Sequence, residues 1–226
     1  MKASVKFNAL FIDLSKLLSR RGLKSFFAKE INKLPVNAQV LIIGAGGTLS
    51  DYLCSLLKTK GVGYKTFDYD SLTKPDILGD IQNTPLNSAY YDAIFLAEVL
   101  EHLPQPQAAI SNIYQALKPS GRLLLSVPFI FPLHEQPNDY YRFTKYGLLY
   151  LLKPFGEVVV LERNFWPESV FILLARLVKE EGKLNKLLGA IFVLVALCSW
   201  PFVFILAQVF SSDFLTTGYT ASAKKS

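Results

Sequence analysis

Short apolar segments alternate with helical ones through the middle of the chain, which points to an α/β fold. Four buried strands, two helices and one turn are predicted there: strands at Val40–Ile43, Tyr64–Asp68, Tyr91–Leu96 and Arg122–Val127, helices at Thr48–Lys58 and Gln107–Leu117, and a turn over 118–121. Apolar strands separated by helices are typical of a parallel sheet covered on both faces. A length of 226 residues suits one such domain and is too short for two comfortable ones.

A glycine turn follows the first of these strands directly. Residues 40–47 read VLIIGAGG, and glycines there let the backbone turn sharply and a ligand approach, while the next helix offers free N–H groups. Asp68 ends the second strand about two dozen residues later, the spacing at which an acid reaches a ribose diol. Such an acid serves NAD and S-adenosylmethionine equally. The dinucleotide pattern needs a third glycine where Leu49 stands, which disfavours NAD.

Three later segments resemble the successive motifs of class I S-adenosylmethionine-dependent methyltransferases (methyltransferase type 11-like). They are residues 79–81 (GDI), 91–103 (YDAIFLAEVLEHL) and 117–128 (LKPSGRLLLSVP), and their order and spacing match over roughly 38–163. Residues 132–144 are similar to a subgroup with an H-x-x-P-x-D-Y-Y-R-F-T segment, often encountered in bacterial cell-surface glycan and lipid pathways. The resemblance implies a Rossmann-like α/β sheet, mostly parallel with an antiparallel last strand, and S-adenosyl-L-methionine as the cofactor.

The resemblance also implies roles for single residues. Gly44, Ala45 and Gly46 would face the methionine part of the cofactor, and Asp68 would hold the ribose hydroxyls. Asp80 and Ile81 would frame the adenine, and Glu98 would line the pocket near the sulfonium. The family usually has an acid two residues before the first glycine. Ile42 stands there instead, so one polar contact to the cofactor is missing.

His134 is the predicted catalytic residue. An oxygen acceptor must lose its proton during methyl transfer, histidine is the usual base, and the chain has two histidines. His134 follows the fifth strand of the family fold, on the expected acceptor side, and is either the base or a group that orients the acceptor. His102 is read as a capping or pocket-wall residue. Tyr140, Tyr141 and Arg142 either bind a sugar or phosphate of the substrate or fix their own loop.

The first 34 residues predict an N-terminal helical region outside the methyltransferase domain, which would cover residues 35–226. Apolar residues recur at helical spacing over 7–18, with a predicted stop at Gly22 and a second short helix over 23–33. This amphipathic region either caps the domain or contacts a membrane surface.

An apolar helical insertion at about 168–210 precedes the expected last strand. Residues 187–210 carry no charge, and ~20 apolar residues suffice to cross a bilayer. The tail at 217–225 resembles the antiparallel strand that pairs beside Glu157–Leu161, so both flanks of the insertion must then lie on one side. We therefore expect a helical hairpin broken near Trp200–Pro201 that dips into one leaflet, with a single span and a frayed tail as the alternative.

Charge and cysteine content narrow the partners and the location. The net charge of +6 and the pI near 9.2 favour anionic surfaces. The basic residues are scattered but flank the insertion on both sides, which favours phospholipid over nucleic acid and a cytoplasmic location at the membrane. Cys54 and Cys198 have no metal-type spacing, so we expect reduced thiols and no metal site.

Three functions follow from these observations. The first is a membrane-associated methyltransferase acting on a small-molecule, glycan or lipid-linked acceptor presented at the bilayer, with O-methylation as one form of the reaction. The second is a binding or scaffold protein that keeps the fold without the activity, which Ile42 supports. The third is an NAD-dependent Rossmann enzyme, which Leu49 and the methyltransferase motifs oppose.

Overall fold

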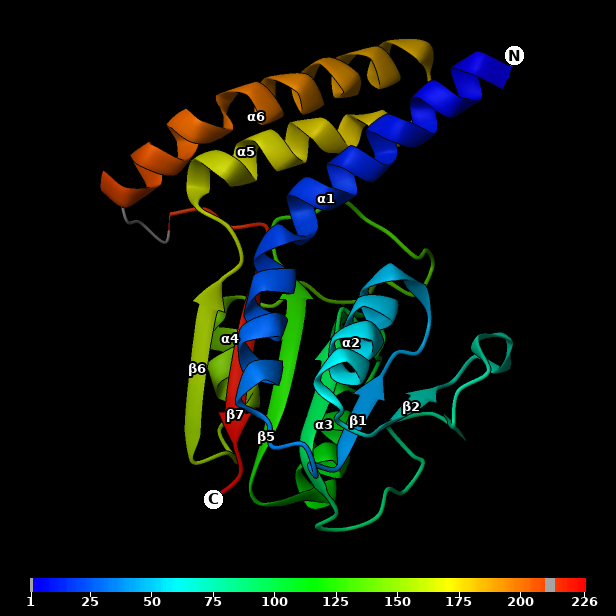
Figure 1. Cartoon of the computed structure of the whole chain (residues 1–226), viewed down its shortest axis with the longest axis vertical. Coiled ribbons are helices and arrows are strands. Elements are labelled where there is room, and N and C mark those ends of the chain that lie inside the picture. Colours follow the sequence, from blue (N-terminus) through cyan, green and yellow to red (C-terminus); the bar gives the residue numbers. More distant parts are fainter. Residues whose placement is uncertain (1, 210–213) are drawn as a thin grey trace. The chain divides into compact units, whose positions relative to one another are not determined.

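The computed structural model describes residues 2–209 and 214–226 (Figure 1). They form two compact units, one made of described residues 2–22, 130–132, 162–209 and 214–218, and the other of residues 23–129, 133–161 and 219–226. The division predicted from the sequence, at 34/35 with an insertion at about 168–210, stays a prediction. Residue 210, the predicted end of the insertion, lies outside the described residues.

A seven-stranded sheet in the order β3-β2-β1-β4-β5-β7-β6 organises the larger unit. The strands are β1 Val40–Ile43, β2 Tyr64–Asp68, β3 Ile77–Leu78, β4 Tyr91–Ala97, β5 Leu117–Pro128, β6 Glu157–Glu162 and β7 Gly218–Lys224. Strands β1 to β5 pair in parallel. Strand β7 runs antiparallel to β6, because the N–H groups of Gly156 and Arg163 donate to the carbonyls of Lys224 and Gly218. The predicted mostly parallel sheet with an antiparallel last strand is confirmed.

Helices cover both faces of this sheet (Figure 1). On one face lie α2 (Gly47–Lys60) and residues 23–33 of α1 (Lys2–Lys33), whose Phe27 packs in the same core as Ile42. On the other face lie α3 (Pro106–Ala116) and α4 (Lys145–Leu151). Side chains alternate along each strand, so both faces of the apolar β1 are buried.

The segment predicted as a turn over 118–121 lies inside β5, so that prediction is wrong. The strand already begins at Leu117, which pairs with Tyr91 of β4. The register then shifts before Ala93, and Ser120 takes a positive φ of 64°. The residues that suggest a turn therefore make an irregularity that the strand absorbs.

Helix α1 runs from Lys2 to Lys33 without a break, so the predicted stop at Gly22 is also wrong. A Cβ atom at Gly22 would lie 2.0 Å from the backbone oxygen of Arg163. Glycine is therefore needed for a close backbone approach, and it does not end the helix. The helix ends instead just before Pro35, since the residue before a proline disfavours helical geometry.

The smaller unit is helical. Helix α5 (Trp166–Ala175) continues into a short 3-10 helix (Arg176–Lys179) and lies beside α6 (Lys183–Val209), as Figure 1 shows. The chain reverses at Gly182, which has a φ of 94°, and Pro201 lies inside α6. A helical hairpin is present, but the break predicted near Trp200–Pro201 is wrong.

Strand pairing brings the two ends of this hairpin together. Arg163, just after β6, donates its N–H to Gly218 at the start of β7, and the Thr217 hydroxyl donates to the side-chain oxygen of Asn164. The tail therefore forms an ordered strand over Gly218–Lys224. The alternative with a frayed tail is wrong.

We expect Gly22→Ala to lower the free energy of unfolding by about 1–3 kcal/mol, since the added methyl group must displace the backbone near Arg163. Helix propensity alone would favour alanine by ~1 kcal/mol, so the sign of the change separates the two effects. Chemical unfolding measures it. Gly63→Ala is the matched control, because a Cβ there meets no atom within 4 Å and should leave stability unchanged or raised. A stabilising Gly22→Ala would contradict the close approach.

Candidate functional site

The carboxyl ends of β1 and β4 form the centre of the site. These neighbours are parallel, and their connections lead to β2 on one side and to β5 on the other, which is where open α/β sheets bind ligands. Gly44 has a φ of 92°, and a Cβ there would lie 2.7 Å from the Val99 side chain. Glycine is therefore required at this position both by its backbone conformation and by the approach of the loop after β4.

Asp68 ties the end of β2 to the glycine loop. One carboxylate oxygen accepts the Ala45 N–H at 2.7 Å and the other accepts the Asp70 N–H at 3.0 Å. Asp68 is buried. The Gly44 N–H donates to the backbone carbonyl of Phe67, the residue before Asp68. Asp68 thus lies beside Gly44, Ala45 and Gly46, as the sequence predicts. Its contact with a ribose stays a prediction.

Asp80 and Ile81 shape the loop after β3. The Asp80 carboxylate accepts hydrogen bonds from the Gln82 backbone, the Gln82 amide and the Asn83 amide. Ile81 is buried and its carbonyl accepts from the Asn112 amide at 2.9 Å. The Asp80 side chain therefore holds its own turn, and the predicted role of this pair in framing adenine stays a prediction.

Glu98 is the first residue after β4 and turns the chain out of the sheet. It has a positive φ of 56°, which is uncommon for a residue with a side chain. Its N–H donates to the Ser126 carbonyl at 3.0 Å, and its carboxylate accepts from the Ser126 hydroxyl at 2.9 Å. Strand β5 thereby fixes Glu98 at the carboxyl edge of the sheet, where the sequence predicts a pocket-lining residue.

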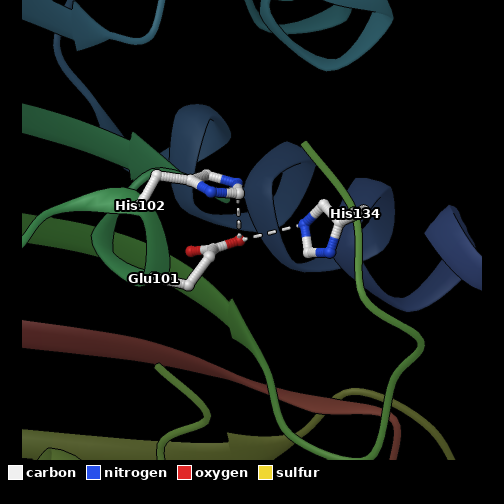
Figure 2. Close-up of side chains that lie close together, drawn as sticks. All are labelled: Glu101, His102 and His134. Carbon is white, nitrogen blue, oxygen red and sulfur yellow. Dashed lines mark ion pairs between the residues drawn. The ribbon is translucent and has the colours of Figure 1, made fainter. Parts of the chain in front are cut away.

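The imidazole rings of both histidines of the chain face the carboxylate of Glu101, and Figure 2 shows the three side chains together. The Nε2 atoms of His102 and His134 are each 3.8 Å from Glu101 Oε1. Glu101 and His102 belong to a short 3-10 helix after β4 (Leu100–His102), while His134 belongs to the segment after β5. The parallel strands thus bring together residues that are distant in sequence.

The Glu101 carboxylate is fully buried. Neither of its oxygens accepts a hydrogen bond from the residues that the structure describes. Burial raises the pKa of Glu101, and the nearby His134 and His102 side chains offset this rise in part, while the negative charge of Glu98 adds to it. A buried acceptor of this kind is costly unless another group satisfies it.

Arg142 and Asp139 form a close ion pair in the loop that carries His134. The guanidinium reaches both carboxylate oxygens, at 2.5 and 2.6 Å, and lowers the pKa of Asp139 to about 2. Asp139 also accepts the His134 N–H at 2.9 Å and lies 3.3 Å from His134 Nδ1. Arg142 therefore stabilises its own loop, and substrate binding by this residue stays a prediction.

Tyr140 and Tyr141 attach the same loop to the 3-10 helix after β4. Both N–H groups donate to the Glu101 carbonyl, at 3.0 and 3.2 Å. The Tyr141 hydroxyl donates to the Pro104 carbonyl, and the Tyr140 hydroxyl donates to the Asn138 side chain. Both residues remain exposed, so their predicted contact with substrate remains open to test.

Sequence reasoning missed two residues of this cluster. Glu101 stands inside the EVLEH motif and Asp139 inside the DYYRF motif, but both are quoted there only as part of a resemblance. The available signal was that each histidine has an acid nearby in the sequence: Glu101 directly precedes His102, and Asp139 follows His134 by five residues. The sequence could not show that both acids would be nearly buried and point toward the histidines.

Comparisons with known proteins agree with this fold. Residues 45–125 match the family model described as a methyltransferase domain, and no curated protein sequence matches the chain. Among solved structures, an S-adenosylmethionine-dependent methyltransferase from Archaeoglobus fulgidus superposes with a TM-score of 0.60 at 17% identity, covering 91% of this chain and 94% of that one.

Two further structures show the same fold at lower coverage of their own chains. Phosphoethanolamine N-methyltransferase 2 of Haemonchus contortus, in complex with S-adenosyl-L-methionine, has a TM-score of 0.59 at 16% identity over 90% of this chain and 52% of its own. This chain thus spans about half of that enzyme. The cyclase SpnF has a TM-score of 0.55 at 14% identity over 90% and 79%. The predicted resemblance, the methyltransferase fold and S-adenosylmethionine as the cofactor of the matched family are confirmed.

We expect Arg142→Gln to lower the free energy of unfolding by about 1–3 kcal/mol, because it leaves a nearly buried carboxylate without its guanidinium. A double-mutant cycle with Asp139→Asn, followed by chemical unfolding, measures the coupling. The lowered Asp139 pKa makes this coupling complete above about pH 4 and lost as the pH falls through about 2. The control is Lys224→Gln, which breaks an exposed pair with Glu157 and should cost less than about 1 kcal/mol. A coupling as small as that of the control would contradict a structural role for Arg142.

Proposed function

We propose that this chain, which has the class I methyltransferase fold, is an S-adenosylmethionine-dependent methyltransferase that acts at the cytoplasmic face of a membrane. The acceptor would be a small molecule, a glycan or a lipid-linked compound. The observation that carries the proposal is the glycine loop at Gly44–Gly46, held by the Asp68 carboxylate at the point where the strand order reverses. The N-terminus of α2, where Gly46 makes no side-chain cap hydrogen bond, lies directly after this loop, and helix N-termini favour anionic groups.

Methyl transfer depends mainly on how the acceptor and the cofactor are positioned. The carbon of the sulfonium is already activated, so holding acceptor and cofactor in line supplies much of the acceleration. An oxygen acceptor also has to lose a proton, and His134 is the candidate base. Support for this role comes from Asp139, which lies 3.3 Å from His134 Nδ1 and so leaves Nε2 as the nitrogen that can take a proton.

The outward face of α6 supports the membrane part of the proposal. Residues Lys183–Val203 have a mean hydropathy of 2.0, and only 28% of the window is buried inside the protein. Large apolar side chains recur every three or four residues on the exposed face: Leu184, Leu187, Leu188, Ile191, Leu194, Val195, Leu197, Phe202 and Ile205. Exposed apolar surfaces of this extent mark sites of contact with a membrane or with a protein partner, and a membrane is the partner proposed here.

The opposite face of α6 packs inside the helical unit, so α6 is buried on one face only, whereas a core helix is buried on most of its surface. Small or branched residues at Ala190, Val193, Ala196 and Val203 are buried within the helical unit. One apolar face is therefore already satisfied, and the second lacks a partner among the described residues. Because β6 and β7 are paired at the ends of the hairpin, the hairpin would enter and leave a bilayer from the same side.

A binding protein without catalytic activity is the second candidate, and Ile42 is the observation behind it. Ile42 is fully buried in the core beneath α1 and α2, where an acid would be costly. The missing acid therefore fits the packing of this chain. The NAD-dependent alternative loses support because β7 is inserted antiparallel between β5 and β6, whereas the dinucleotide-binding fold has the order 3-2-1-4-5-6.

Calorimetric titration of the detergent-solubilised chain with S-adenosylmethionine and S-adenosylhomocysteine tests the first part of the proposal. We expect binding by the wild type and a loss of roughly ten- to hundredfold in Asp68→Ala, which removes a buried carboxylate that holds the glycine loop. NADH should not bind.

The matched control is Asp51→Ala, which removes an exposed carboxylate from α2 near the same loop and should bind as the wild type does. Thermal unfolding of both variants shows whether they are folded. A folded wild type that binds neither compound would shift the function to the non-catalytic candidate. Equal binding by folded Asp68→Ala would remove Asp68 from the cofactor site.

Sedimentation with anionic phospholipid vesicles tests the membrane part. The double variant Leu187→Gln, Leu194→Gln changes only exposed side chains of α6, and we expect partitioning to fall by roughly ten- to hundredfold from the lost apolar contact. Leu72→Gln is the control, because it removes a still more exposed leucine outside α6. Unchanged partitioning of the double variant would rule out α6 as the membrane contact.

A further inference from the structure

We propose that Glu101, His102 and His134 form a binding site for a divalent transition-metal ion. Three ligand atoms of the types that bind such ions, two imidazole nitrogens and one carboxylate oxygen, lie within 4.8 Å of one another (Figure 2). Two histidines with one carboxylate leave coordination positions open for other ligands. The site goes beyond the proposed methyltransferase function, since it depends on a different set of atoms from the glycine loop.

The outer partners of the histidines direct their inner nitrogens toward the carboxylate. His102 Nδ1 lies 2.6 Å from the Asn138 carbonyl, which can only accept, so Nδ1 carries the proton. His134 Nδ1 faces the Asp139 carboxylate at 3.3 Å in the same way. Metal-binding histidines characteristically donate their other ring N–H to a carbonyl or a carboxylate. Both Nε2 atoms therefore present lone pairs toward Glu101.

A divalent ion between the two Nε2 atoms and the Glu101 carboxylate would bind all three groups at once. A shared proton would bring each nitrogen to a hydrogen-bonding distance of about 2.7–3.2 Å. The observed distance is 3.8 Å for both pairs. Ligand atoms bound to one ion at ~2.1 Å stand about 3–3.5 Å apart, so a metal ion would draw the three ligand atoms inward from separations of up to 4.8 Å. The buried Glu101 oxygens, without hydrogen bonds from the described residues, would gain a partner.

The type of ion follows from the donors. Imidazole nitrogens favour Zn²⁺, Fe²⁺, Ni²⁺ or Cu²⁺ over Mg²⁺ and Ca²⁺, which prefer oxygen ligands, and Co²⁺ lies between Fe²⁺ and Ni²⁺ in the order of affinity. Glu98 adds negative charge close by, because it acts on the Glu101 carboxylate electrostatically. Its own carboxylate is held by Ser126 at the end of β5. The Arg142 guanidinium also acts on Glu101 and Glu98, but it is one positive charge against the carboxylates of Glu98, Glu101 and Asp139. An excess of carboxylates suits a divalent cation.

A bound ion would change the role proposed for His134 from base to ligand. Coordination lowers the pKa of a hydroxyl group, so an acceptor hydroxyl on the ion would release its proton to water. Its oxygen would then form the bond to the methyl carbon as the carbon–sulfur bond breaks, and S-adenosylhomocysteine would leave as a neutral thioether. Acceptors with hydroxyl groups are the class that this site favours.

Titration of the chelator-treated full chain with Co²⁺, without S-adenosylmethionine, tests the site through the visible absorption bands of the bound ion. We expect one equivalent to bind the wild type and raise its melting temperature. Glu101→Gln should weaken binding at least a hundredfold, and Asp139→Asn, which acts through His134, about ten- to hundredfold. A Cys54→Ser, Cys198→Ser background excludes thiolate ligands.

Glu135→Gln is the matched control, because it removes an exposed carboxylate from the same loop and should leave Co²⁺ binding unchanged. If Glu101→Gln does not fold, His102→Asn gives the same test from the partly exposed side of the cluster. A wild type that takes up no Co²⁺, or a folded Glu101→Gln that binds it as tightly as the wild type, would overturn the proposal. Since no cofactor is present, either result is independent of whether the chain binds S-adenosylmethionine.

Discussion

The parallel pairing of β1 with β4 is the interaction on which the candidate site depends. The connections after these two strands lead to opposite sides of the sheet, so the loops at their carboxyl ends lie next to each other. The glycine loop after β1 and the segment from Glu98 to His102 after β4 both start at this edge. Strand β5, parallel to β4, adds the loop with His134. Residues from three distant parts of the chain thereby share one edge.

Antiparallel pairing of β6 with β7 has a comparable effect on the helical insertion. A segment that leaves β6 and returns to β7 has to begin and end at adjacent points, and here it does so as a pair of neighbouring helices. Both helices of the hairpin can then be apolar without sending the last strand across a bilayer. The fold thus accommodates a long apolar insertion because the strand pairing, and not the helices, determines where the chain re-enters the sheet.

The strands could be predicted from the sequence because each is a short apolar run with helical segments on either side. What the sequence could not show were contacts between distant residues. Gly22 looks like a helix stop until Arg163 is seen to need the space of its missing side chain. Ser120 looks like part of a turn until the pairing of Leu117 with Tyr91 is known. Pro201 looks like a break, yet α6 continues through it. In each case a local propensity is overridden by packing.

One part of the candidate site could be predicted from the sequence and another could not, for the same reason. The glycine loop and Asp68 are readable because their spacing reflects one strand, one helix and the next strand, all local in sequence. The cluster at Glu101 is not readable in this way, because a histidine assigned as a base and one assigned as a wall residue meet on a carboxylate that neither assignment mentions. A histidine that acts as a base is oriented by one carboxylate at its other ring nitrogen, and Asp139 lies 3.3 Å from His134 Nδ1. A second histidine and a buried carboxylate in front of it have no part in that mechanism, whereas a metal site requires both.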